Sequence, residues 1–163
     1  MPTQLYFFVS VALSLVAWSM VAKRYMWPKL RDRQRVESLR PILMLHSFRF
    51  FGLAFLMPGI VSAALPAAFA KAAAYGDFGA AILALLALAS LRAGRIGIAV
   101  AWIFNIWGLI DLLNAFYEGN ASGLLPGQLG AMYFLPTLVV PLLLVTHVLA
   151  FRILVTRTSQ LPA

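Results

Sequence analysis

The residues of this chain most able to do chemistry are ionisable side chains inside apolar segments. His46 and Arg49 lie within PILMLHSFRFFGLAFLMPGIV, residues 41–61, and His147 lies within a later apolar run. A charged side chain at the centre of a membrane helix costs roughly 2.5–3.5 kcal/mol on insertion scales, so such residues often mark functional sites. They are therefore the first candidates for function.

The spacing and depth of these residues suggest an inner polar site. His46 and Arg49 are three residues apart and share one helical face. Both histidines lie roughly 8–10 Å inside the basic ends of their spans, at a rise of about 1.5 Å per residue. The matched depth predicts a site formed by His46, Arg49 and His147. A simpler interpretation has each imidazole hydrogen-bonded to a neighbour such as Thr146 or Ser47.

Two histidines at one depth also admit a bound metal or cofactor. Haem iron takes histidine as an axial ligand. A b-type haem held by His46 and His147 would place Arg49 near a propionate. The sequence therefore leaves haem b, or a metal bound by the two imidazoles, open beside a shared proton or anion.

A second set of polar residues lies around Asp111 on the fourth apolar run. Asp111 is in the half of this span that is remote from the basic loops. Prolines of the second and fifth spans lie at comparable depth, and each frees a backbone carbonyl. In a membrane such a carbonyl must find a partner or line a wet cavity. The plainer interpretation is a neutral Asp111 hydrogen-bonded to Asn114. We predict a hydrated outer pocket formed by Asp111, Asn114, Trp107, Pro58, Pro136 and Pro141.

Composition places all these residues in a membrane protein. The chain has 163 residues, of which 63% are hydrophobic and 11% charged, and its mean hydropathy is +0.90. A soluble domain of this size needs far more polar surface. There is no cysteine, which excludes disulfides, thiolate metal sites and iron–sulfur clusters. Phosphate-loop, HExxH and serine-nucleophile motifs are also absent, so the sequence favours a protein that is not an enzyme.

Five apolar segments position the polar residues. They predict an all-α, polytopic membrane helix bundle in which residues 1–163 form a single transmembrane domain. Gly76-Asp77 is interpreted as a turn in which Asp77 caps the third helix. An alternative with four spans leaves residues 78–91 outside the bilayer core. The predicted spans are about 5–22, 41–64, 77–92, 96–117 and 132–154.

The basic residues predict orientation and partners. The net charge is +8, and residues 23–40 alone hold seven Lys or Arg. Basic loops stay cytoplasmic, so the N-terminus is predicted outside and the C-terminus inside. Charge between spans fits anionic lipid at the 23–40 loop rather than nucleic acid. We expect a bacterial inner-membrane protein, forming a homo-oligomer or part of a larger membrane complex.

The leading functional hypothesis is permeation or transport of a proton, an ion or a small polar solute. Asp111 and Asn114 would form an outer site, and His46, Arg49 and His147 an inner relay or gate. Histidine titrates near neutral pH, which suits proton handling. The alternatives are a b-type haem redox protein and a non-catalytic membrane subunit or assembly partner. A lipid-modifying enzyme ranks behind these.

Overall fold

The chain folds into a bundle of helices. The structure, a computed structural model, describes residues 3–156 and has no β-strand in that range. The predicted all-α fold is confirmed, whereas the number of helices that cross the bilayer and their orientation stay predictions. The predicted cytoplasmic C-terminus falls outside the described residues. Five helices are long and apolar enough to cross a membrane: Thr3–Arg31, Arg35–Leu56, Ala67–Ser90, Arg95–Ala121 and Leu135–Thr156.

The first two of these helices change geometry along their length. The first consists of α1 (Thr3–Val21), a π-helical turn η1 (Ala22–Met26) and α2 (Trp27–Arg31). The second begins as α3 (Arg35–His46) and continues as a 3-10 helix, η2 (Ser47–Leu56). The break in geometry therefore falls at the first candidate site residue, His46.

The remaining helices complete the bundle. The two long helices α4 (Ala67–Ser90) and α5 (Arg95–Ala121) form a hairpin. A short 3-10 helix η3 (Pro126–Tyr133) then leads into a π-helical turn η4 (Leu135–Val139) and α6 (Val140–Thr156). The last membrane-length helix thus starts from an irregular turn, as its prolines require.

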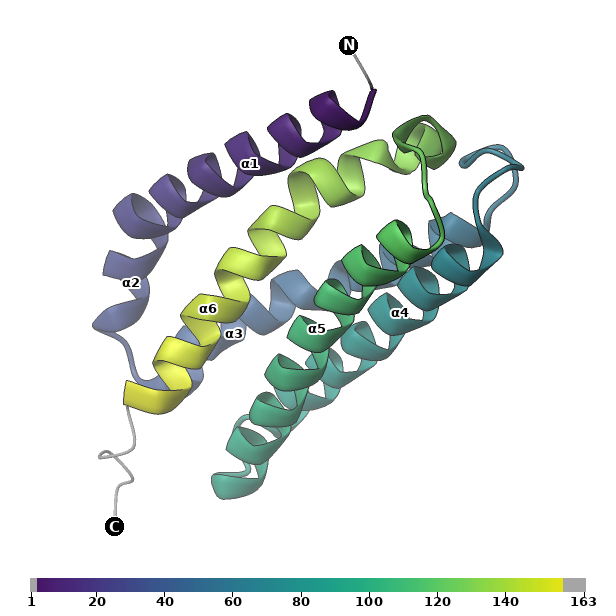
Figure 1. Cartoon of the computed structure of the whole chain (residues 1–163). Helices are drawn as coiled ribbons and strands as arrows, with labels where there is room; N and C mark the ends of the chain where they lie inside the picture. The colour runs from purple at the N-terminus through teal and green to yellow at the C-terminus, as the bar shows by residue number, and fades with distance from the viewer. Residues whose placement is uncertain (1–2, 157–163) are drawn as a thin grey trace.

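The α4–α5 hairpin lies on one side of the bundle and α1 on the other, with α6 between them (Figure 1). The closest packing joins α4 to α5 and α4 to η2, while α6 contacts both α3 and α5. Helix α1 lies at the edge of the bundle and packs along α6 and η4. Buried alanines such as Ala74, Ala80 and Ala84 give α4 a face of small side chains. Small residues let membrane helices approach closely. This close approach brings η2, α4 and α5 together around one point.

The 3-10 geometry of η2 aligns a set of residues that an α-helix would separate. His46, Arg49, Gly52 and Phe55 recur every third residue and are all buried, whereas Phe48, Phe50 and Phe51 are exposed. Side chains at i and i+3 eclipse one another in a 3-10 helix. At about 100° per residue, an α-helix would turn Phe55 to the side opposite His46. The 3-10 helix therefore presents one continuous face to the bundle interior.

The turn predicted at Gly76-Asp77 is wrong. Gly76 and Asp77 do not form a turn, because α4 runs unbroken from Ala67 to Ser90 and Asp77 lies buried within it. Pro66 stands immediately before the first helical residue, and the alanine-rich segment that follows has high helix propensity. The helix therefore continues through Gly76, and Asp77 is not its cap.

Pro58 also lies outside the helix to which it was assigned. The second helix ends at Leu56 and not near residue 64, because Met57 has extended backbone angles (φ −92°, ψ 117°). A residue that precedes proline disfavours helical geometry, and Gly59 follows with φ 84°, which glycine adopts without strain. Pro58-Gly59 thus ends the helix and introduces no kink within a span.

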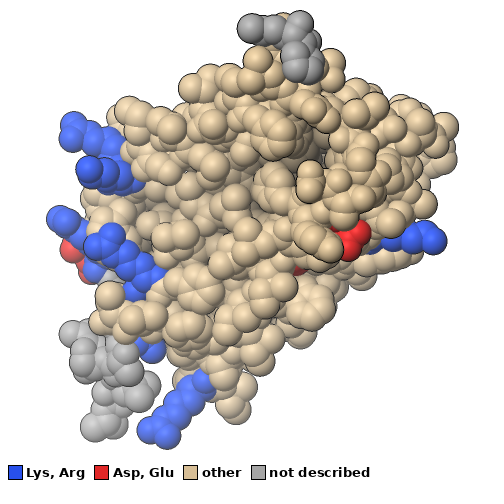
Figure 2. Space-filling view, in the orientation of Figure 1, with Lys and Arg blue, Asp and Glu red and all other residues tan. Residues whose placement is uncertain are grey.

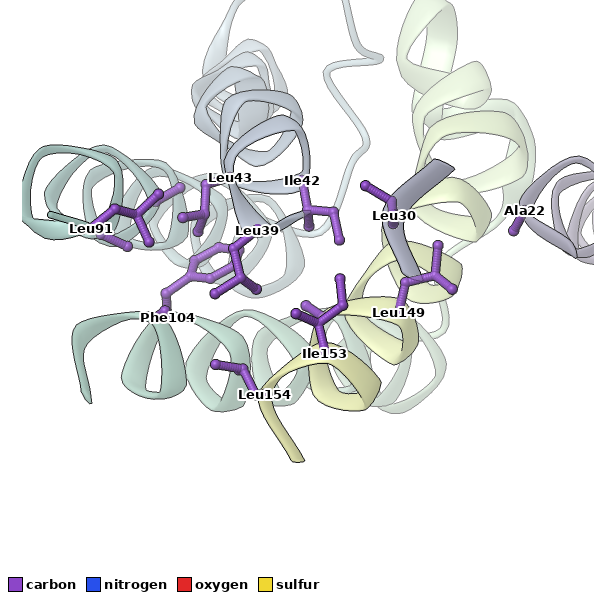
Figure 3. Close-up of a cluster of buried hydrophobic side chains, with 14 residues drawn as sticks. Ala22, Leu30, Leu39, Ile42, Leu43, Leu91, Phe104, Leu149, Ile153 and Leu154 are labelled. Carbon is purple, nitrogen blue, oxygen red and sulfur yellow. The ribbon is translucent and has the colours of Figure 1, made fainter. Parts of the chain in front are cut away.

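The two ends of the bundle differ in composition. Figure 2 shows most Lys and Arg gathered at one end, near the C-terminal end of α6 and the α4–α5 turn in the orientation of Figure 1. Toward that end a cluster of large apolar side chains fills the interior between α3, α5 and α6 (Figure 3). Leu39, Ile42, Leu43, Phe104 and Ile153 are almost completely buried there. We call this group the basic-end apolar cluster.

Candidate functional site

Arg49 is the centre of the candidate site. Its side chain is 1% exposed and projects from η2 toward α4 and α5. Nε donates to Oδ1 of Asp77 at 2.7 Å, and Nη2 donates to Oδ2 of Asp111 at 2.5 Å. Nη1 donates to the carbonyl of Gly108 at 3.0 Å. Three helices are therefore joined by one guanidinium, with both carboxylates on neighbouring nitrogens.

Glycines on the same helices leave the space that these charged groups occupy. A Cβ at Gly52 would lie 2.6 Å from Cβ of Asp77, and one at Gly76 would overlap the carboxylate of Asp111. A Cβ at Gly108 would lie 2.8 Å from Nη1 of Arg49 and 2.6 Å from Cε1 of His147. Real Cβ atoms essentially never come that close to a neighbour. The backbone of η2, α4 and α5 is thus fitted to the ionic network.

His147 extends the network from α6. Its Nε2 lies 3.4 Å from Nη1 of Arg49, and its Nδ1 lies 2.7 Å from Oδ1 of Asn105. Arginine can only donate, so Nε2 carries the lone pair and Nδ1–H donates to Asn105. The amide of Asn105 donates in return to the His147 carbonyl at 3.3 Å. These contacts fix the ring as a neutral imidazole with a defined tautomer.

His46 closes the network on the side of α3. Its Nε2 lies 2.9 Å from Oγ1 of Thr146, which also lies 2.9 Å from the carbonyl of Leu142. The threonine hydroxyl has one proton, so if it donates to that carbonyl, Nε2–H of His46 donates to Oγ1. Nδ1 of His46 is buried and has no hydrogen-bond partner among the described residues. His46 therefore makes the contact expected from its simpler interpretation.

A cavity of about 360 Å³ opens onto the two carboxylates. Its lining contains Asp77 and Asp111 and, at the ends of α1 and α5, the exposed residues Gln4 and Asn120. Between them the walls are mainly apolar. The cavity therefore runs from the ionic network to the end of the bundle remote from the basic-end apolar cluster. Its aromatic lining consists of Phe7, Phe8, Phe55, Phe69 and Phe116.

The structure joins the two polar sites that the sequence suggested separately. Arg49 and His147, from the inner site, contact Asp111, from the outer one, either directly or through the guanidinium. Pro136 lines the same cavity. One network with one cavity thus replaces two sites at different depths.

The other residues assigned to the outer pocket lie elsewhere. Trp107 and Asn114 are exposed on α5, and Pro141 is buried in the first turn of α6. Pro58 lies in the turn after η2, and none of these four residues lines the cavity. Asp111 bonds to Arg49 and not to Asn114. Because α5 turns only part of its face inward, residues on one helical stripe do not all reach the cavity.

The two histidines do not fit a haem. Their ring centroids are 4.3 Å apart with planes at 57°, whereas two axial ligands of one haem iron stand on opposite faces of the porphyrin. Nε2 of His46 and Nδ1 of His147 are both held by polar side chains. Among the described residues there is also no group of three or more metal-ligating side chains. The haem alternative therefore gains no support from the geometry.

Asp77 is the functional candidate that the sequence did not reveal. Its side chain is 10% exposed and pairs with Arg49. The sequence signal for it is a carboxylate inside an alanine-rich segment. This signal is easily missed, because the preceding Gly76 makes the segment resemble a turn. Had the helix been extended back to Pro66, Asp77 would have been recognised as a second intramembrane acid.

The comparisons with known proteins place the chain in a family. No curated protein and no solved structure gives a significant match to it. A family model described as "Domain of unknown function (DUF8737)" matches residues 6–155, which include every residue of the network and all but one of the residues that line the cavity. The chain belongs to this family, the Domain of unknown function (DUF8737).

Proposed function

We propose that the protein transports protons or small cations across a membrane, with Asp77 and Asp111 as the exchange site. The observation that carries this proposal is the charge of the site. Two carboxylates share one guanidinium at the base of a cavity. With all three groups ionised the cluster has a formal charge of minus one. An unpaired charge is costly in a poorly solvated interior, so the site favours one further positive charge.

Each of the two carboxylates has one oxygen that Arg49 leaves unbonded, Oδ2 of Asp77 beside Gly52 and Oδ1 of Asp111 beside Gly76. Arg49 bonds Oδ1 of Asp77 and Oδ2 of Asp111. Within the described part of the chain, no hydrogen bond reaches the second oxygen of either carboxylate, and both residues line the cavity. A proton or cation that enters from the cavity therefore reaches two carboxylates that each keep an unbonded oxygen. Arg49 then acts as a fixed counter-charge that keeps the two acids together.

A polar path continues beyond the carboxylates toward the basic end. Arg49 leads to His147, which bonds Asn105, and the ring of His46 lies beside that of His147. Phe104 packs against both imidazoles, with centroid distances of 5.1 and 5.4 Å. The basic-end apolar cluster therefore closes the path on that side. Transport requires this cluster to separate in a second conformation, while the cavity closes.

Flux in reconstituted vesicles tests the proposal. Purified protein is incorporated into vesicles with a pH-sensitive dye inside, and a proton or cation gradient is imposed. Asp111→Asn and Asp77→Asn keep the shape of the side chain but remove its titration, and each should abolish flux. Glu118→Gln is the matched control, because Glu118 lies two turns further along α5 and outside the cavity lining.

Two results would contradict transport. Flux that persists unchanged in both aspartate variants would show that the carboxylates are not the exchange site. No flux of protons or of any tested cation through the wild-type protein would favour a non-catalytic membrane subunit.

A further inference from the structure

We infer, on the basis of the proposed function, that the cation exchanged at this site is an organic ammonium ion with an apolar body. The cavity has two buried carboxylates at its closed end and aromatic side chains along its wall. The carboxylates favour the ammonium group, and the aromatic wall favours the apolar body. Its volume of about 360 Å³ lies within the range of small-molecule pockets.

The two carboxylates at the closed end of the cavity select for a positively charged ligand. Asp77 is buried, and its Oδ2 has no hydrogen-bond partner in the part of the chain that the structure describes. Oδ1 of Asp111 is likewise unused by Arg49. An ammonium group has up to three N–H donors, and both carboxylates line the cavity that it would enter. Charge-assisted hydrogen bonds of this kind are about twice as strong as neutral ones.

The aromatic wall favours a cation that has an organic body. Phe55 and Phe69, in contact edge to face at 5.4 Å between centroids, both line the cavity. The other aromatic residues of the lining are Phe7 and Phe8 from α1 and Phe116 from α5. Aromatic faces attract ammonium ions, most strongly where water is excluded. The hydrocarbon part of the ligand gains from burial against the same rings.

An inorganic cation fits the cavity poorly. Ca²⁺ takes about 6–8 oxygen ligands and Mg²⁺ a near-ideal octahedron of oxygens. The base of the cavity offers the two unused carboxylate oxygens, and the side-chain amides of its lining, Gln4 and Asn120, are at its other end. An inorganic ion would therefore lose more hydration than the walls replace, whereas an ammonium group needs only up to three hydrogen-bond acceptors and its apolar body gains from burial.

Binding of the ammonium ion displaces a proton. The empty site keeps one proton between Asp77 and Asp111, which balances the cluster; when the ammonium binds, the carboxyl O–H bond breaks and the proton leaves to water. The other charged or titratable groups at the site are Arg49 from η2, His147 from α6 and His46 from α3. The parts of α1, η3 and η4 that line the cavity contribute none. One ammonium is thus exchanged for one proton.

Calorimetry on the detergent-solubilised protein tests this inference without relying on flux. The probe is 2-phenylethylammonium, and 2-phenylethanol is its uncharged counterpart of similar shape. The ammonium should bind at least tenfold more tightly, about 1.4 kcal/mol. Titrations in buffers of different ionisation enthalpy should show release of about one proton per ligand, and affinity should fall about tenfold for each pH unit lowered. Asp77→Asn and Asp111→Asn should lose this preference, whereas Glu118→Gln should keep it.

The outcomes separate the inference from the proposed function. Equal affinity for the amine and the alcohol would overturn the inference, and this comparison uses the wild-type protein alone, so it does not depend on the folding of a variant. No binding of the amine, together with proton flux in vesicles, would also overturn it while leaving transport intact. Selective binding of the amine with no flux of any kind would instead reject transport.

Discussion

At the residue scale, pairing is what makes Arg49 tolerable in the interior. Arg49→Met would leave Asp77 and Asp111 buried without their cation, and removal of one member of a buried ion pair costs on the order of 3–5 kcal/mol. The triple variant Arg49→Met, Asp77→Asn, Asp111→Asn removes all three charges at once. We expect the single variant to be strongly destabilised and the triple variant to regain most of the loss.

Thermal unfolding in detergent, followed through the fluorescence of the four tryptophans, measures this difference. The Arg49→Lys variant is a useful companion, since lysine keeps the charge but cannot reach both carboxylates with a planar fork. If the single and triple variants melted at the same temperature, charge pairing would not be the source of the stability.

The same residues show how far sequence reasoning reaches. His46, Arg49, Asp111 and His147 were recognisable because ionisable groups are rare and costly in apolar spans. Their union in one network was not predictable from depth, which fixes height in the bundle but not direction around the helix. The long side chain of Arg49 reaches both His147 and Asp111, whose different depths suggest two separate sites.

At the element scale, the glycine of α5 determines how closely this helix approaches the network. Gly108→Ala would place a methyl group 2.6 Å from His147 and 2.8 Å from Arg49. We expect a loss of about 1–3 kcal/mol from overpacking, although alanine is the better helix former by up to about 1 kcal/mol. Gly79→Ala in α4 is the control, because its nearest neighbour, Nε1 of Trp107, would lie at an ordinary 3.5 Å.

Melting temperatures of the two variants decide this prediction. Gly79→Ala should melt at or above the wild-type temperature and Gly108→Ala below it. Equal stability of both variants would mean that the bundle can relax around Gly108. The comparison is informative because the two substitutions are chemically identical and differ only in the space available.

The helices themselves were largely predictable, but their geometry was not. Apolar length located five of them, since only long runs satisfy both composition and span length. The 3-10 helix η2 is not predictable from an α-helical period of 3.6 residues, because its buried residues His46, Arg49, Gly52 and Phe55 follow a period of three. The assignment of Gly76-Asp77 to a turn failed for a related reason, since glycine weakens a helix without always ending it.

At the scale of the whole molecule, the cavity and the basic residues lie at opposite ends of the bundle. Figure 2 shows most of the basic side chains gathered at the end that the apolar cluster closes, while the cavity reaches Gln4 and Asn120 at the other. If basic loops face the cytoplasm, the structure is the outward-open form of the proposed transporter. Orientation therefore decides from which side a ligand enters.

Single-cysteine labelling tests this orientation directly, because the chain contains no cysteine of its own. A membrane-impermeant maleimide added to intact cells should label Asn120→Cys at the cavity end of α5. Arg33→Cys, between α2 and α3, and Arg92→Cys, in the α4–α5 turn, should react only after the cells are permeabilised. Labelling of Arg92→Cys alone in intact cells, with Arg33→Cys and Asn120→Cys protected, would support the four-span alternative. Labelling of Arg33→Cys in intact cells, with Asn120→Cys protected, would reverse the molecule and make the cavity open to the cytoplasm.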